Sequence, residues 1–172
     1  MKSAGHPSTS AAPAPAAAPP IGSIVLISSI AAQSKSFLSP LYCAGKAALS
    51  SFVRTLSDLE AGVGIRVTAV APGLVQTPLF TDDPAKLAWI DQDKDVWVTP
   101  SEVAEVMLEC VQGDKWKGGM VVEVGSGQTR VVERLNDPGP QGKGFGVSGK
   151  GLVKEYMGIF GALKTPGWGL SK

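Results

Sequence analysis

The stretch IRVTAVAPG, residues 65–73, decides the fold of this chain. It is rich in β-branched and small apolar residues, contains one charge, and ends in the chain-breaking pair Pro72 and Gly73. A short apolar run of this kind is typical of a strand that is covered on both faces, as the strands of a parallel sheet are. The sequence therefore predicts a buried strand over this stretch.

Two similar apolar runs lie on either side of it along the chain. GSIVLISS (22–29) precedes it and GGMVVEVGSG (118–127) follows it, and each predicts a further strand, the first of them fully buried. Helical signals separate the runs: Ser39 and Pro40 suit an N-cap and a first helical position, and TPSE (99–102) is a capping box. The order strand, helix, strand, helix, strand predicts an α/β fold with a parallel sheet.

The spacing of apolar residues supports both helices. After each start, apolar residues recur one helical turn apart, which predicts one buried face per helix. We expect the first helix to end at Gly62 and Gly64. The apolar positions are Leu49, Phe52, Val53, Leu56 and Leu59 in the first helix, and Val103, Val106, Met107, Cys110 and Val111 in the second.

The chain divides into three predicted regions. Residues 1–20 are rich in alanine and proline and predict a flexible tail. Residues 21–130 hold the strands and helices. Residues 131–172 form a glycine-rich C-terminal extension.

The extension contains a G-x-G-x-x-G pattern at Gly144, Gly146 and Gly149. A dinucleotide fingerprint must follow a strand directly, but the residues before it, RLNDPGPQGK (134–143), cannot form one. We therefore interpret the pattern as a loop. Residues 152–163 predict a short helix or a docking arm.

The composition argues against several classes of function. The net charge is +1 and the basic residues are scattered, which argues against nucleic acid or an anionic membrane as the main partner. The single histidine, His6, lies in the tail, so we predict no metal site and no Ser–His–Asp triad. Cys43 and Cys110 predict buried or half-buried reduced thiols. No run is long and apolar enough to span a bilayer and no targeting signal is recognisable, so we expect a cytoplasmic protein.

Tyr42 and Lys46 are four residues apart at the start of the first predicted helix, so they share one of its faces. Such a pair alone is weak evidence, because chance produces it in a lysine-containing chain of this size. Its surroundings strengthen it: Ser29 ends the first strand and the turn Pro72–Thr77 follows the second. Open parallel sheets bind ligands at the carboxyl ends of their strands. These residues therefore predict one site at that edge.

Taken together, GSIVLISS (22–29), YCAGK (42–46) and IRVTAVAPGLVQTPL (65–79) strongly resemble the second half of classical short-chain dehydrogenases/reductases. The likeness covers residues 21–140 and is greatest to fungal members similar to 15-hydroxyprostaglandin dehydrogenase, which share the ending style of residues 118–140. It implies a partial Rossmann-like sheet, in which the three predicted strands are the last three of the family's doubly wound sheet and are mutual neighbours.

The resemblance also implies roles for individual residues. Tyr42 would be the general acid/base, Lys46 would lower its pKa and hold the nicotinamide ribose, and Ser29 would orient the substrate oxygen. A tyrosine normally titrates near ~10, so a nearby ammonium makes it usable as a base. The cofactor, NADP or NAD, would be bound by Tyr42, Lys46, Pro72, Gly73, Val75 and Thr77. Ser29, Val75 and Thr77 also have simpler interpretations, as a strand-end cap, a packing residue and a turn residue.

Other features of the family pattern do not occur in this sequence. A glycine-rich turn of the T-G-x-x-x-G-x-G type, which holds the cofactor pyrophosphate at a helix N-terminus, has no counterpart before residue 22. The NNAG-type strand end, the helix with the fourth catalytic residue and the position that selects NAD or NADP are likewise not found. We therefore expect weak or absent cofactor affinity in the isolated chain, and a strand at 22–29 that leaves an apolar edge uncovered.

Two hypotheses follow. The first is an oxidoreductase that interconverts an alcohol and a ketone with NAD(P); a role in fungal secondary metabolism follows from the resemblance alone. The second is a non-catalytic remnant or scaffold. The expected partners are a small apolar alcohol or ketone and, as cover for exposed helix surface, a second subunit. The apolar residues of the segment 78–98 that suggest an apolar substrate are Phe80, Leu87, Trp89, Ile90 and Trp97; covering the sheet explains them equally well.

Overall fold

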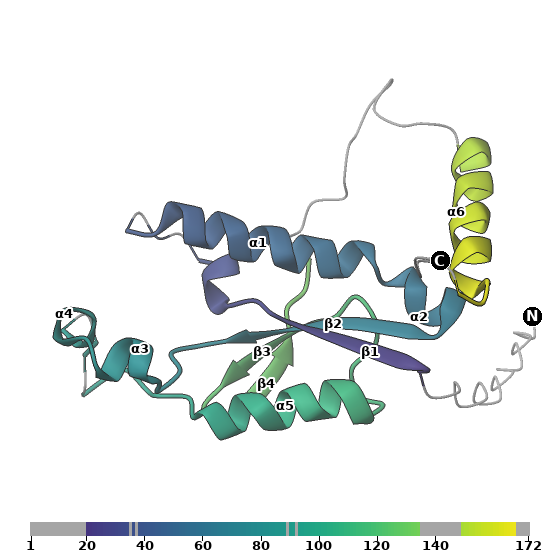
Figure 1. Cartoon of the computed structure of the whole chain (residues 1–172). Helices are drawn as coiled ribbons and strands as arrows, with labels where there is room; N and C mark the ends of the chain where they lie inside the picture. Colours follow the sequence, from purple (N-terminus) through teal and green to yellow (C-terminus); the bar gives the residue numbers. More distant parts are fainter. Residues whose placement is uncertain are drawn as a thin grey trace, which may run out of the picture.

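A four-stranded sheet forms the centre of the molecule (Figure 1). The structure is a computed structural model that describes residues 20–34, 36, 38–88, 90–91, 93–134 and 149–167. The strands are β1 (Gly22–Ile27), β2 (Ile65–Pro72), β3 (Val121–Gly125) and β4 (Gln128–Val131), in that spatial order. The first three are parallel neighbours, as predicted, and β4 is antiparallel to β3.

Helices lie on both faces of the sheet, with α1 on one side and α5 on the other (Figure 1). The helices are η1 (Ile30–Ala32), α1 (Pro40–Thr55), α2 (Asp58–Val63), α3 (Pro78–Thr81), α4 (Pro84–Leu87), α5 (Pro100–Gln112) and α6 (Gly149–Lys164). The structure confirms the predicted α/β fold.

The core is divided by β2, whose residues after Ile65 are all buried. Alternate side chains of a strand point to opposite faces, so β2 contributes to two clusters. On the α5 side Val70 packs with Val106 and Trp116. On the α1 side Val67 and Ala69 pack with Val53. The stretch on which the fold prediction rested is therefore the centre of both cores.

The first predicted strand is not fully buried. β1 pairs with β2 on one side and forms an edge of the sheet, and Ile24 and Ile27 are each 52% exposed. The apolar pattern shows that a strand is hydrophobic. Full burial also requires neighbouring elements on each side of the strand. The prediction of full burial was wrong, whereas the predicted apolar edge is confirmed for the described residues.

The first predicted helix differs in two respects. It is divided at residues 56–57 into α1 and α2, and Gly64, at φ 72, caps α2 in the left-handed conformation. Within α1 Val53 is fully buried, but Phe52, predicted on the same face, is 53% exposed. The capping box at the start of α5 is confirmed, with Thr99 and Glu102 bonded reciprocally.

Later parts of the chain add two elements. β4 was not predicted; it returns from β3 through a two-residue connection in which Gly127 has φ 66. The helix predicted at 152–163 is α6, and Phe160 of α6 lies against Gly62 of α2. Gly144 and Gly146 of the glycine pattern lie outside the described residues.

Both cysteines are free thiols, Cys110 buried and Cys43 half-buried, as predicted. Burial is the main cause that raises the pKa of the Cys110 thiol, which keeps it in the unreactive protonated form near neutral pH. Among the described residues, no helix is sufficiently long and apolar to cross a membrane.

Candidate active site

Three hydrogen bonds attach α1 to the carboxyl end of β1. The Lys46 ammonium donates to the Ile27 carbonyl (2.8 Å), and the Ser28 hydroxyl donates to the Lys46 carbonyl (3.1 Å). The Ser28 and Ser50 hydroxyls also bond to each other in a buried position (2.8 Å). The helix that carries Tyr42 and Lys46 is thereby held at the carboxyl ends of the strands, where the sequence predicted the site. Ser28 and Ser50 were not predicted; the serine doublet at 28–29 was the available signal.

Tyr42 and Lys46 lie one turn apart on α1, as their spacing requires. The Lys46 ammonium is 5.6 Å from the centroid of the Tyr42 ring. Tyr42 as a residue is 52% exposed, so a ligand can reach its side chain. The Lys46 ammonium uses one of its three N–H donors for the bond to the Ile27 carbonyl, so two donors are left. The structure thus brings together a phenol and a cation that both keep spare hydrogen-bonding capacity.

Ser29 follows β1 and begins η1. Its hydroxyl oxygen accepts a hydrogen bond from the Ala31 N–H (3.1 Å) and caps this short helix. A hydroxyl that accepts one hydrogen bond keeps its own proton for donation. The capping role that was the simpler interpretation of Ser29 is therefore present, but Ser29 caps η1 rather than the end of β1. This cap leaves the Ser29 hydroxyl able to donate to a second group.

Pro72 and Gly73 end the central strand. The ladder between β1 and β2 continues as far as the Ser28 N–H, which donates to the Val70 carbonyl (2.7 Å), and Ser29 comes directly after it. The Gly73 N–H donates to the Val124 carbonyl (2.9 Å). A methyl group at Gly73 would meet its neighbours only at an ordinary 3.6 Å, and its φ is not in the left-handed region. Packing within the chain does not require a glycine there.

Val75 and Thr77 lie in the turn after β2. Val75 forms an isolated parallel bridge with Val98, in which the Gln76 N–H donates to Val98 and the Leu74 carbonyl accepts from it. In this pattern the flanking residues make the bonds, so the N–H and carbonyl of Val75 itself point the other way. Thr77 caps α3 by position but makes no capping bond with its side chain. Both residues therefore have polar groups available at the carboxyl edge.

The predicted site residues form two sets in the structure. Tyr42, Lys46 and Ser29 are joined through α1, η1 and the end of β1, whereas Val75 and Thr77 belong to the end of β2. Among the described residues no hydrogen bond joins the turn to Tyr42 or Lys46. A ligand at this edge would lie between the two sets.

An open groove of about 500 Å³ lies next to the turn, along α3 and α4. Its lining includes Gln76, Leu87 and Trp97, and the Trp97 ring packs edge-to-face on Phe80 with centroids 6.2 Å apart. Of the apolar residues predicted for this segment, Trp89 lies outside the described residues. The groove is mainly apolar.

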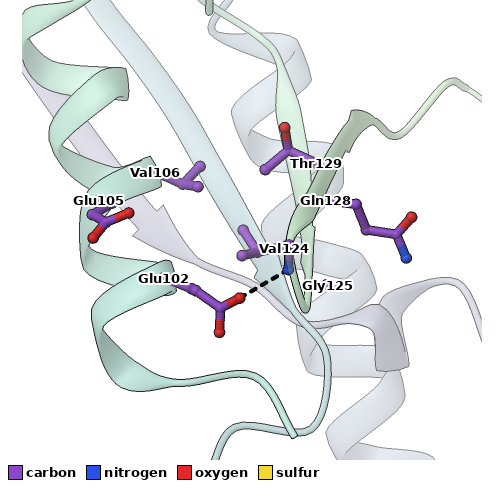
Figure 2. A pocket seen from close by; sticks show the side chains of 8 residues that line it. Glu102, Glu105, Val106, Val124, Gly125, Gln128 and Thr129 are labelled. Atoms are coloured by element: carbon purple, nitrogen blue, oxygen red, sulfur yellow. Dashed lines mark hydrogen bonds between the residues drawn. The ribbon is translucent and has the colours of Figure 1, made fainter. Parts of the chain in front are cut away.

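A second hollow, of about 270 Å³, lies between α5 and the β3–β4 hairpin (Figure 2). Glu102 extends across it and accepts a hydrogen bond from the Gly127 N–H (2.8 Å). Hydrogen bonds from Thr99 and Gly127 lower the pKa of this carboxyl. Because its oxygens are already occupied by these donors, Glu102 is a structural anchor for the hairpin and a poor acid/base candidate. No predicted site residue lines this hollow.

A model of the family described as short chain dehydrogenase matches residues 3–88, which is half of the 172 residues. A short-chain dehydrogenase/reductase of the fungus Penicillium rubens, prx7, is 34% identical over 97 residues, which cover 56% of this chain and 33% of the relative.

Two solved structures share the fold. A 3-hydroxyacyl-CoA dehydrogenase type-2 from Mycobacterium avium is 27% identical with a TM-score of 0.51, over 69% of this chain and 48% of that one. A 3-oxoacyl-[acyl-carrier protein] reductase from Brucella melitensis is 31% identical with a TM-score of 0.50, over 59% and 40%. The matched region is therefore less than half the length of each of these relatives.

Proposed function

Because the chain belongs to the short-chain dehydrogenase/reductase family, we propose that it interconverts an alcohol and a ketone by hydride transfer with NADP or NAD. One observation carries the proposal. The Tyr42 phenol and the Lys46 ammonium lie 5.6 Å apart, ring centroid to nitrogen, on a helix attached to the carboxyl end of β1. That is the edge at which open parallel sheets bind ligands.

Each of the three catalytic candidates has a role that its geometry allows. The Tyr42 hydroxyl donates a proton to the ketone oxygen and takes one from the alcohol in the reverse direction. The Lys46 ammonium stabilises the negative charge that the phenol oxygen acquires when it gives up the proton. The Ser29 hydroxyl, which keeps its own proton while it caps η1, donates to the same substrate oxygen and orients it.

The residues at this edge suit the nicotinamide part of the cofactor. Lys46 has two donors left after its bond to Ile27, which match the hydroxyls of a ribose. The outward N–H and carbonyl of Val75, with the Thr77 hydroxyl, match a carboxamide, which needs one acceptor and one donor. Pro72 and Gly73 bring this turn to the edge. When bound, the cofactor supplies or accepts the hydride.

The apolar groove beside the turn supports an apolar substrate. Leu87 and Trp97 line it, and Gln76 connects it to the turn that carries Val75. A ketone with a hydrocarbon substituent would place the substituent in the groove and the oxygen toward Tyr42 and Ser29.

The test begins with titration of the purified chain with NADH and NADPH, followed by energy transfer from its tryptophans. The sequence predicts weak or absent affinity for the cofactor in the isolated chain, so the titration extends to millimolar cofactor. We expect saturable binding, and turnover of apolar ketones that falls by about 10²- to 10⁴-fold in Tyr42→Phe, which removes the hydroxyl group that carries the transferable proton and keeps the ring.

Phe52→Tyr is the matched control, because Phe52 is an exposed aromatic residue on the same helix and its variant gains the hydroxyl that Tyr42→Phe loses. We expect this control to keep wild-type turnover. Unchanged turnover in Tyr42→Phe would contradict the assigned role of Tyr42. Absence of binding at millimolar cofactor would contradict the proposal as a whole and favour a non-catalytic role.

A further inference from the structure

The side chains of Glu123 and Arg130, which face each other in the β3–β4 hairpin, form a closed ring of hydrogen bonds with the sequence-distant Gln33 beside η1. The Arg130 guanidinium holds Glu123 through two donors, its Nε at 3.0 Å and its Nη2 at 2.5 Å. Gln33 completes the ring: its amide nitrogen donates to Glu123 (3.0 Å), and its amide oxygen accepts from Arg130 (3.1 Å). Both polar ends of the Gln33 side chain are therefore used.

The ring is built on rigid elements. Glu123 of β3 and Arg130 of β4 are directly opposite each other in the antiparallel ladder. The hairpin that carries them is fastened to α5 by the bond between Gly127 and Glu102 (Figure 2). The position of the ion pair is therefore set by the sheet and does not depend on Gln33. Gln33 lies 97 residues before Arg130 in the chain, and this bond therefore connects two distant segments.

Gln33 is at one end of η1, and Ser29 is at the other. The Gln33 N–H donates to the Ile30 carbonyl (2.9 Å), the Ala32 N–H donates to the Ser29 carbonyl (3.0 Å), and the Ser29 hydroxyl caps the Ala31 N–H. Only one turn separates the two residues. Any rotation of η1 away from the sheet would move the Ser29 hydroxyl with it.

The small folding free energy expected of these interactions indicates that they orient η1 rather than stabilise the fold. Arg130 is 58% exposed, and exposed ion pairs contribute little to folding free energy. A bidentate guanidinium–carboxylate pair is nevertheless strongly directional. A directional contact of small net energy suits the alignment of a short helix that carries a functional hydroxyl.

We propose that Arg130 and Glu123, acting through Gln33, are positioning residues that orient the Ser29 hydroxyl toward the substrate oxygen. This inference rests on the proposed function for its catalytic consequence. None of the three residues needs to touch the substrate.

The kinetic test compares Gln33→Ala and Arg130→Gln with the wild type. We expect kcat to fall about 10-fold in each, with a change in KM of less than about two-fold, because misorientation of a positioned group reduces the reactive fraction without removing binding contacts. The charge-swapped double variant Glu123→Arg with Arg130→Glu should recover most of kcat, since the Gln33 amide can rotate and bond to the exchanged pair. Lys117→Gln, which breaks an exposed ion pair with Asp114 before β3, should change neither constant.

A second measurement does not depend on activity. In the ¹⁵N-labelled full chain, backbone order parameters of residues 30–32 should fall in Gln33→Ala and in Arg130→Gln, and should remain at the wild-type level in Lys117→Gln. Unchanged order parameters in both ring variants would overturn the inference, as would unchanged kcat in an active enzyme. A wild-type chain without turnover would count against the proposed function, while the order parameters would still decide whether the ring aligns η1.

Discussion

The two ends of the parallel strands are built differently. At the amino end, the Arg66 side chain is only 1% exposed, and its donors are taken up by Glu60, the Gly113 carbonyl and Asp114. At the carboxyl end, Tyr42 is half exposed, and Lys46 retains donors beyond its bond to Ile27. One end uses its polar groups within the chain, and the other leaves some of them free.

This difference separates stability from ligand binding. Glu60 accepts from Arg66 and from the Gly118 N–H, so it links α2, β2 and the loop before β3. A buried charge held in this way is costly to disturb. Spare donors and acceptors at the other end cost little in water and become useful when a ligand arrives. Substitutions at the amino end should therefore affect folding, and those at the carboxyl end should affect binding and turnover.

The largest effect on stability is expected for Glu60→Ala. The variant leaves the buried Arg66 charge without its main partner, and breaking a buried pair typically costs about 3–5 kcal/mol. Since Asp114 and the Gly113 carbonyl still accept from Arg66, we expect a loss near the lower limit, about 3 kcal/mol, in urea unfolding followed by tryptophan fluorescence. Lys94→Ala, which breaks an exposed pair with Asp91, should cost less than about 1 kcal/mol. Equal losses of unfolding free energy in the two variants would show that the buried pair of Glu60 and Arg66 is no more important for stability than an exposed pair.

A pair of glycine substitutions tests the same contrast at intermediate size. Gly119, at the amino end of β3, has φ 85, and a methyl group there would lie 2.6 Å from the Ser57 Cβ. Gly119→Ala should lower the free energy of unfolding by about 1–3 kcal/mol. Gly73→Ala, at the carboxyl end of β2, meets only ordinary contacts and should raise it by about 0.4–1 kcal/mol, through lower entropy of the unfolded chain. Thermal unfolding of both variants measures the difference, and the reverse order of stability would argue against a tightly packed amino end.

The smallest effect is expected from acid. Partial burial works to raise the pKa of Glu60, but hydrogen bonds from Arg66 and Gly118 and the charges of Arg66 and Lys117 outweigh it, so the pKa lies below its usual 4.5. A carboxyl with a lowered folded-state pKa stabilises the fold above its unfolded-state pKa, and this contribution is lost as the pH falls through the folded-state value. The free energy of unfolding should therefore decrease below about pH 5. Glu60→Gln should be less stable near neutral pH and should lose part of this dependence; an identical acid profile for both proteins would show that Glu60 is not its source.

Much of the fold could be predicted because its elements are specified by residues that are close together in the sequence. The apolar run at 65–73 and the capping box at Thr99 and Glu102 each predict an element from adjacent residues, and both predictions are confirmed. The strand β4 was missed because its residues, Gln128–Val131, are mostly polar and exposed. The Ser126–Gly127 pair before it signals a turn but not by itself a second strand.

For the candidate site, the sequence could supply a set of residues but not their arrangement. The spacing of Tyr42 and Lys46 places both on one face of any helix, and the structure shows them there. The bond from Lys46 to Ile27 and the cap made by Ser29 on Ala31 depend on how α1 and η1 lie against the sheet. Their catalytic and cofactor-binding roles remain predictions that the proposed experiments test.

The sequence by itself determined the order of the three parallel strands and of the two long helices between them, and the residue types at the carboxyl ends of the strands, because helical and strand periodicity and capping act between residues a few positions apart. Only the tertiary structure decided that Arg66 is buried among Glu60, Gly113 and Asp114, and that Gln33 meets Arg130. These contacts join residues up to 97 positions apart. Their formation depends on the packing of whole elements, for which no local pattern exists.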